Sequence, residues 1–304
     1  MQDTRIALAI CNAKIGATQE NIDKAATYVQ QAVQAEADII CFPELTVTGY
    51  TNRDGVSAVA ETVPGPSSER LSHLAAASKI LVLAGLAEKD AADRIFASHL
   101  VCYPDGRVDV YRKIHIAPPE RHLYSPGDQV PLFNFKGLRF GIQLCYDAHF
   151  PELSTRMALS GAELVFIPHA SPRGRAPEKH RSWMRHLSAR AFDNGIFIAA
   201  CNQTGQNGAG LTFPGNALVI GPSGNLVMKY TGGRETLQLV DLSAGDLETV
   251  RRSRMRFFLP FRRPDLYGPL CCEAGIENAC SAAAPIRKPS AESIAKSPHV
   301  RSRT

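Results

Sequence analysis

The feature that most constrains the fold is an ordered series of short apolar runs, some followed by helical patterns and others by tight turns. Residues 6–11, 164–167 and 196–200 are apolar at successive positions, so both faces of each of these strands should be covered. Turn signals P-D-G (104–106) and G-P-S-G (221–224) join other runs as hairpins. Strands connected in both ways predict an α/β protein with mixed sheets buried between layers.

Periodicity gives the expected elements. A 3.6-residue repeat predicts helices over 21–36, 68–79, 153–162 and 179–195. The buried face of the first should hold Ile22, Ala25, Ala26, Val29, Ala32 and Val33. Apolar runs predict strands over 5–12, 38–43, 80–88, 163–168 and 196–203, and hairpins over 97–113, 132–145 and 216–230.

The composition changes near residue 271. Residues 1–270 alternate strand and helix patterns and are expected to form one domain, which is within the size range of layered α/β proteins. Residues 271–304 have few large apolar side chains and no sustained period, so they are predicted to be disordered. A docked C-terminal arm is the alternative.

Charge and cysteine content narrow the class of protein. The formal net charge of +5 is spread over 304 residues, and the basic cluster at 251–256 is interpreted as a solvated helix face, so nucleic acid is not an expected partner. No apolar run approaches the roughly 20 residues that cross a bilayer. The N-terminal segment does not resemble a signal peptide, and a cytoplasmic protein without membrane contact is expected. The eight cysteines form no metal-ligand spacing, and Cys11, Cys41, Cys102 and Cys201 are expected to be buried thiols.

Three ionisable residues lie at the ends of predicted strands, where sites of layered α/β proteins assemble. Glu44 follows a strand and Pro43, Lys113 closes a hairpin, and Cys145 ends an apolar run. Each alone is better explained as a loop carboxylate, an edge-strand lysine and a core thiol. Together they offer a base, a cation and a nucleophile, which is what a cysteine hydrolase needs.

The segments around these residues, F-P-E-L-x-x-T-G-Y (42–50), Y-R-K-I-H (111–115) and L-C-Y-D-x-x-F-P-E (144–152), resemble the nitrilase superfamily of carbon–nitrogen hydrolases. The resemblance covers about residues 4–270. It continues through S-P-G-D, G-A-E-L-V-F-I-P, A-R-A-F-D-N and R-R-P-D-L-Y, at 125–128, 161–168, 189–194 and 262–267. It implies a four-layer α-β-β-α sandwich and a homodimer or higher homo-oligomer, to which the helix at 154–161 could contribute.

The resemblance also implies roles for individual residues. Cys145 would be the nucleophile, Glu44 the general base and Lys113 the cationic partner. Glu120 precedes S-P-G-D as a second glutamate of the family does, and it would orient Lys113 or the substrate. The backbone N–H of Tyr146 would join Lys113 in stabilising the oxyanion. The reaction would pass through a thioester, and neither a metal nor another cofactor is expected.

The substrate class is predicted from the residues beside the nucleophile. Tyr146-Asp147 is similar to the amidase-type branches, which favours a small amide or N-carbamoyl (ureido) compound over a nitrile. Ala148 and His149 stand where the branch acting on N-carbamoyl-D-amino acids has arginines, which argues against that substrate. Nitrile hydrolysis, or an interaction module without turnover, are the alternatives.

Candidate substrate-binding residues are Tyr50, His169 and Arg173. The hypothesis for the arginine is that Arg173 or Arg175 pairs with a substrate carboxylate. Two other aromatic side chains are expected to have structural roles only. His115 should alternate with Lys113 on one strand face, and Trp183 should pack within its helix.

Overall fold

The computed structural model of the chain describes residues 1–267. Contacts divide the chain into two units, residues 1–260 and residues 261–304. In the described part of the second unit, helix α6 (Pro264–Tyr267) contains Asp265, which forms an ion pair with Arg263 just before the helix. No helix of residues 1–267 is long and apolar enough to cross a membrane. The predicted disordered tail, 271–304, lies outside the described residues.

Two six-stranded sheets form the centre of the first unit. The first sheet runs, in spatial order, β14 (Thr236–Leu242), β1 (Thr4–Ile10), β2 (Ile39–Cys41), β3 (Leu81–Lys89), β4 (Ile95–Cys102) and β5 (Val108–Arg112). The second runs β13 (Leu226–Tyr230), β12 (Ala217–Ile220), β9 (Phe197–Asn202), β8 (Leu164–His169), β7 (Leu138–Ile142) and β6 (Phe133–Phe135). A separate small pair joins β10 (Thr204–Gln206) to β11 (Thr212–Pro214).

Each sheet is mixed in the same way. Strands β1, β2 and β3 are parallel, as are β7, β8 and β9, and the flanking strands of both sheets pair antiparallel. The parallel strands are connected by helices and the antiparallel ones largely by hairpins, which is the predicted combination. The hairpin at P-D-G joins β4 to β5, and the one at G-P-S-G joins β12 to β13.

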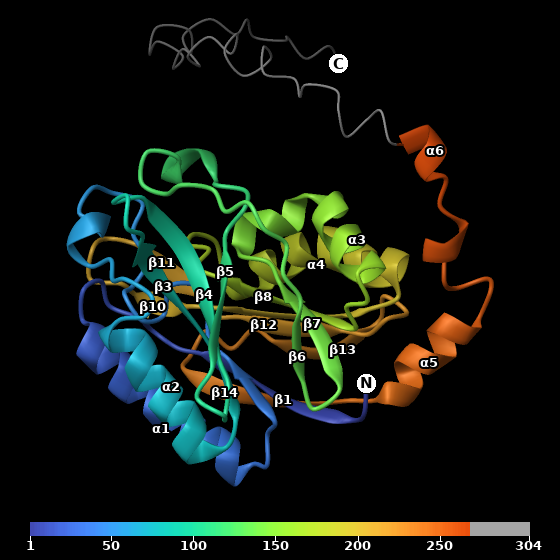
Figure 1. Cartoon of the computed structure of the whole chain (residues 1–304), viewed down its shortest axis with the longest axis horizontal. Coiled ribbons are helices and arrows are strands. Elements are labelled where there is room, and N and C mark those ends of the chain that lie inside the picture. The colour runs from blue at the N-terminus through green and yellow to red at the C-terminus, as the bar shows by residue number, and fades with distance from the viewer. Residues whose placement is uncertain (268–304) are drawn as a thin grey trace, which may run out of the picture. The chain divides into compact units, whose positions relative to one another are not determined.

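Helices cover the outer face of each sheet. Helices α1 (Thr18–Gln34) and α2 (Pro66–Ser78) pack on the first sheet, and α3 (Pro151–Leu159) and α4 (Ala176–Asn194) lie over the second (Figure 1). Since β1 also contacts β9, the two sheets pack face to face. The unit is therefore the predicted α-β-β-α sandwich. Helix α5 (Ala244–Arg252) follows β14, and short 3₁₀ turns are η1 (Val56–Ala58), η2 (Pro118–Glu120), η3 (Cys145–His149) and η4 (Leu259–Phe261).

The layering explains why the strands are apolar on both faces. In β1, Ile6, Leu8 and Ile10 belong to the core between the sheets, whereas Ala7 and Ala9 belong to the core beneath the helices. Side chains of successive strand residues point to opposite faces, so one strand supplies both cores. Burying large side chains between the sheets and small ones under the helices stabilises the stack by about 25 cal/mol per Å² of apolar surface removed from water.

Two local predictions need correction. In α1, Tyr28 is buried where Ala26 and Val33 were expected, because the helix turns its Ile22–Val29 stripe to the sheet and leaves Val33 41% exposed. The basic cluster 251–256 is not one helix face, since α5 ends at Arg252. Within that cluster the Arg251 side chain lies partly buried and donates to the Ala162 carbonyl at 2.9 Å.

The topology brings together the segments that follow several strands. Glu44 follows β2, Cys145 follows β7, and Ala170 follows β8; these are parallel strands of the two sheets. Carboxyl ends of parallel strands meet at one edge of a sheet, which is where layered α/β proteins build their sites. With the two sheets face to face, this edge is shared by residues from both.

Candidate active site

Glu44 is placed by a tight approach of its loop to strand β3. The next residue, Leu45, has a left-handed backbone (φ 55°), and the Val47 N–H donates to the Gly85 carbonyl at 2.8 Å. A Cβ atom on Gly85 would lie only 2.4 Å from the Leu45 nitrogen. Only glycine fits at that strand position without moving the loop that carries Glu44.

The loop after β5 carries both Lys113 and Glu120. Lys113 immediately follows β5, and Glu120 lies in the 3₁₀ turn η2. Gly127, of the S-P-G-D motif, donates its N–H to the Lys113 carbonyl at 2.8 Å, and a Cβ atom there would meet the Arg112 oxygen at 2.6 Å. The motif therefore closes this loop against the backbone that holds Lys113.

Cys145 begins a 3₁₀ turn after β7 with a left-handed backbone (φ 45°). A non-glycine residue in that region is uncommon and strained, and such residues cluster at functional sites. The residue is half-buried, whereas Cys11, Cys41, Cys102 and Cys201 are buried as predicted. Cys145 is thus set apart from the core thiols by its backbone and by its exposure to a cavity.

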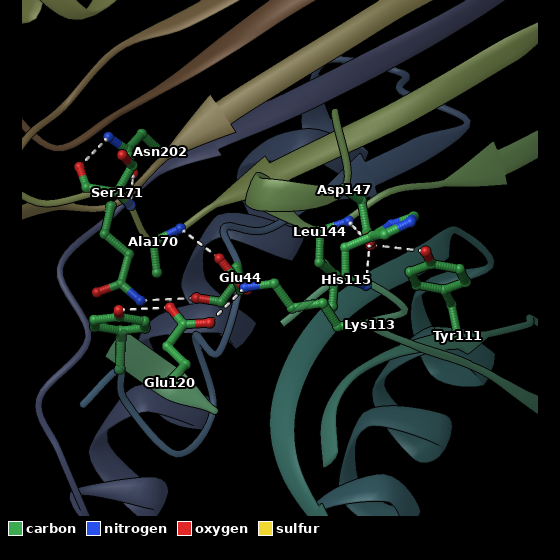
Figure 2. A network of polar contacts seen from close by, with 12 residues as sticks. Glu44, Tyr111, Lys113, His115, Glu120, Leu144, Asp147, Ala170, Ser171 and Asn202 are labelled. Atoms are coloured by element: carbon green, nitrogen blue, oxygen red, sulfur yellow. Dashed lines mark hydrogen bonds and ion pairs between the residues drawn. The ribbon is translucent and has the colours of Figure 1, made fainter. Parts of the chain in front are cut away.

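The two glutamates and the lysine converge in the interior. The Lys113 Nζ atom donates to Glu44 Oε1 at 2.9 Å and to Glu120 Oε2 at 2.8 Å (Figure 2). The Glu44 and Lys113 side chains are each 1% exposed. Glu44 Oε2 accepts the Ala170 N–H at 2.9 Å, and Glu120 Oε1 accepts the Tyr50 hydroxyl at 2.7 Å. One ammonium thus pairs with two carboxylates, and every oxygen of the two accepts a hydrogen bond.

Burial and charge shift the pKa of each group. Burial raises the pKa of Glu44, and Glu120 adds to this while Lys113 opposes it. Burial alone lowers the pKa of Lys113, but the two carboxylates outweigh it and raise that pKa well above its usual value. Burial and the charge of Glu44 raise the pKa of the Cys145 thiol, against the effect of Lys113. The resting site therefore holds a charged lysine, a neutral thiol and a carboxylate with increased proton affinity.

A third buried carboxylate of the site, Asp147, connects the Cys145 turn to the Lys113 segment. It accepts the Tyr111 hydroxyl at 2.8 Å, the His115 N–H at 2.8 Å and the Leu144 N–H at 3.0 Å (Figure 2). His115 Nδ1 also lies 2.9 Å from Asp147 Oδ1. Sequence reasoning used Asp147 only as a branch marker and missed this role; the signal was its place two residues after the cysteine.

The structure corrects the interpretation of His115 as a strand residue. Strand β5 ends at Arg112, so Lys113 and His115 do not alternate on one strand face. Lys113 points to the glutamates, whereas the His115 ring binds Asp147 and stacks on Phe150 with ring centroids 3.7 Å apart.

A cavity of about 300 Å³ opens above Cys145. Its walls include the predicted substrate-binding residues Tyr50, His169 and Arg173, and the cavity also reaches Glu120 and Tyr146. Trp183, predicted as packing alone, also lines the cavity and stacks on His169 at 4.1 Å. Further lining residues, which sequence reasoning did not single out for the site, are Asn52, Ser171, Lys179 and His186.

The structure refines the predictions made for Tyr50 and for the pair Arg173 and Arg175. Tyr50 lines the cavity, but its hydroxyl is engaged by Glu120. Of the two arginines, Arg173 lines the cavity, whereas the exposed Arg175 pairs with Glu178 at 2.7 Å.

Among residues 1–267, no group of three or more His, Cys, Asp or Glu side chains is arranged to hold a metal ion, and a metal-free reaction stays a prediction.

The family model described as carbon-nitrogen hydrolase matches residues 5–252. The (R)-stereoselective amidase of a Pseudomonas species is 30% identical over 217 residues, which cover 71% of this chain and 77% of the amidase. The probable nitrilase C965.09 of Schizosaccharomyces pombe is 29% identical over 260 residues, covering 84% and 93% of the two chains.

Solved structures give the same result. A mutant of the Nesterenkonia AN1 amidase from the nitrilase superfamily superposes with a TM-score of 0.75 at 26% identity, covering 88% of this chain and 97% of the amidase. Another mutant of that amidase shows covalent addition of the acetamide moiety of fluoroacetamide at its active-site cysteine, and a further one binds butyramide. Because one family model spans most of the sandwich and both kinds of relative follow the chain along most of its length, this chain belongs to the carbon–nitrogen hydrolase family, in the amidase-like part of the nitrilase superfamily.

Proposed function

We propose that this chain hydrolyses the carbon–nitrogen bond of small carboxamides or N-carbamoyl compounds, with Cys145 as the nucleophile. The observation that carries the proposal is the Glu44–Lys113–Glu120 cluster, buried beside the cavity into which Cys145 opens. Nucleophile, proton acceptor and cation are the three functions that acyl transfer through a thiol requires. The covalent addition of an acetamide moiety at the cysteine of the Nesterenkonia amidase supports the role of Cys145 as a nucleophile here.

In the first half-reaction, Glu44 accepts the Cys145 proton as sulfur attacks the amide carbon. The raised pKa of the thiol keeps it protonated until then, and the raised pKa of Glu44 makes the carboxylate a stronger base. The carbon–nitrogen bond then breaks, and Glu44 gives its proton to the leaving nitrogen. Ammonia or an amine departs, and a thioester on Cys145 remains.

In the second half-reaction, Glu44 takes a proton from water as the water oxygen attacks the thioester. The carbon–sulfur bond breaks, the acid is released, and Cys145 regains its proton. Both tetrahedral intermediates carry an oxyanion, for which Lys113 and the backbone N–H of Tyr146 are the proposed donors. One well-placed donor is typically worth about 3–4 kcal/mol of barrier.

Glu120 has the role of holding Lys113. Its carboxylate accepts from both Lys113 and Tyr50, so it supplies a second negative charge that keeps the ammonium protonated. His169 and Arg173 are proposed to contact the substrate, because both line the cavity. His169 is buried and both its ring nitrogens are free of hydrogen bonds within residues 1–267. Burial lowers its pKa well below the usual value, so it would meet the substrate as a neutral ring.

A substrate panel tests the proposal. Ammonia release should be measured with butyramide, an N-carbamoyl amino acid and butyronitrile, with Cys145→Ala as the blank. We expect release from at least one of the first two, none of it in the blank, and a slower rate from the nitrile. Faster release from the nitrile would reverse the substrate assignment, and turnover by the blank would rule out Cys145 as nucleophile.

A further inference from the structure

The outer wall of the cavity carries two cations without acidic partners. Lys179, on α4, and Arg173, on the preceding loop, both line the cavity. Within residues 1–267, neither side chain is in an ion pair with a carboxylate. Lys179 is partly buried, whereas Arg173 is exposed. A partly buried cation without a counter-charge has lost part of its hydration, so Lys179 favours an anion in the cavity.

Lys179 is held in a fixed position. Its Nζ atom donates to Ser171 Oγ at 2.8 Å and to the Pro172 carbonyl at 3.3 Å. Ser171 is itself clamped by Asn202, which accepts the Ser171 N–H at 2.9 Å and donates to the Ser171 carbonyl at 3.0 Å (Figure 2). An ammonium has three N–H groups, so one remains for a ligand. This side chain is preorganised, unlike a solvated lysine on a helix surface.

The two ends of the site differ in charge. At the inner end, one ammonium faces the carboxylates of Glu44 and Glu120. At the outer end stand Lys179 and Arg173, together with His149 and His186. Burial lowers the pKa of both histidines, that of His186 to about 4, so they add hydrogen-bonding groups and no positive charge near neutrality. A substrate with an amide at one end and an anion at the other would be oriented by this difference.

We propose that Lys179, assisted by Arg173 at the rim, binds a carboxylate of the substrate, so that the preferred substrates are amides that carry a carboxylate. This inference rests on the proposed function and adds a specificity residue to it. Lys179 and Cys145 line the same cavity of about 300 Å³. A carboxylate bound at Lys179 would therefore share that cavity with the attacking sulfur.

The carboxylate can be on either side of the scissile bond. In a monoamide of a dicarboxylic acid it belongs to the acyl part, whereas in an N-carbamoyl amino acid it belongs to the leaving amine. Both present the same group to Lys179. Glutaramic acid and N-carbamoyl-β-alanine represent the two, and butyramide and N-propylurea are their uncharged counterparts.

The kinetic test compares each acid with its uncharged counterpart. We expect kcat/KM of the wild-type protein to be at least about tenfold higher for the acid in one of the two pairs, since a hydrogen bond to a charged group is worth about 1.5–3 kcal/mol. Lys179→Met should remove most of that ratio through KM, Lys179→Arg should restore part of it, and Arg173→Ala should reduce it less. The pair that shows the effect identifies the side that bears the carboxylate.

Arg175→Met is the matched control. It removes a cation two residues from Arg173 that is exposed and paired with Glu178, and the ratio should not change. Equal kcat/KM for acid and uncharged amide in the wild-type protein would overturn the inference while leaving the hydrolase proposal intact. A preference for the acid that survives in Lys179→Met would equally overturn it.

A binding measurement keeps the inference testable if turnover is absent. Calorimetric titration of the Cys145→Ala protein with glutaramic acid should give tighter binding than titration with butyramide, and the additional Lys179→Met change should abolish the difference. The proposed hydrolysis fails if no substrate is turned over. The carboxylate site fails if neither acid binds more tightly than its uncharged counterpart.

Discussion

Lys113 carries one positive charge against two carboxylates in a space from which water is nearly excluded. The excess of negative over positive charge in this cluster determines which of its groups can exchange a proton. The ammonium is held charged, so the group left to exchange a proton with Cys145 is Glu44. Glu120 acts on the same equilibrium, because its charge raises the pKa of Glu44 and also that of Lys113.

The first prediction concerns pH. Glu44 must be ionised to accept the thiol proton, so kcat/KM for butyramide should fall as the pH drops through the raised pKa of Glu44. Glu120→Gln removes one cause of the raised pKa of Glu44, so the acidic limb of the kcat/KM profile should move to lower pH. Glu69→Gln, an exposed change on α2, should leave the limb in place. A limb that moves to higher pH in Glu120→Gln would contradict the proposed coupling.

The second prediction concerns Asp147, a positioning residue. Asp147→Asn cannot accept all the N–H and O–H groups that now converge on the carboxylate, and we expect it to lower the free energy of unfolding by about 2–4 kcal/mol. It should also slow alkylation of Cys145 by iodoacetamide and lower kcat more than it changes KM. Asp109→Asn, at a partly exposed pair with Arg107, should cost about 0.5 kcal/mol or less. An equal loss in the free energy of unfolding in Asp147→Asn and Asp109→Asn would show that Asp147 is not a positioning residue.

At the scale of elements, the sequence patterns predicted most of the strands and hairpins, because burial on both faces leaves a clear signal in the sequence; the four-layer arrangement came from the family resemblance. Strand β14 was not predicted: it pairs with the whole of β1, but exposes alternate residues such as Leu239 and lies outside the quoted motifs. The S-P-G-D motif was recognised by resemblance, whereas its function is a backbone contact. No side-chain chemistry of Gly127 could have indicated that contact.

The third prediction tests that contact. In Gly127→Ala, the added Cβ would meet the Arg112 backbone oxygen at 2.6 Å, so the loop must move and carry Lys113 with it. We expect kcat to fall about tenfold or more, with a lowered melting temperature. Gly245→Ala, in helix α5, meets only the Ser243 hydroxyl at 3.3 Å and should be neutral or slightly stabilising. Unchanged kcat in Gly127→Ala would show that the loop does not position Lys113.

At the scale of the whole molecule, the site consists of contacts between segments that are far apart along the chain. Glu44 is bound by the N–H of Ala170, 126 residues away, across the two sheets. The motifs predicted which residues would gather, since three strand-end boxes occur in order. They could not predict Lys179 or the Ser171–Asn202 clamp, because those depend on how a loop and a helix fold over the cavity.

The fourth prediction concerns assembly, and it follows from the family resemblance. The helix predicted at 154–161 was named as one that could contribute to a homodimer or higher homo-oligomer; most of it lies in α3, on which Leu159 is 50% exposed. We expect light scattering to give at least a dimer, and Leu159→Glu to shift it toward the monomer. Glu152→Gln changes another exposed residue of α3 and is the control; it should leave the oligomeric state unchanged. A monomeric wild-type protein would contradict this prediction without affecting the site.

The central claim is that Cys145 carries the acyl group during turnover, and peptide mass spectrometry after rapid acid quench tests it most directly. In the wild-type protein quenched during turnover, the Cys145 peptide should gain the mass of the acyl group of the amide supplied. The gain should be absent in Cys145→Ala. An acyl group on a different residue, or full turnover by Cys145→Ala, would contradict the account.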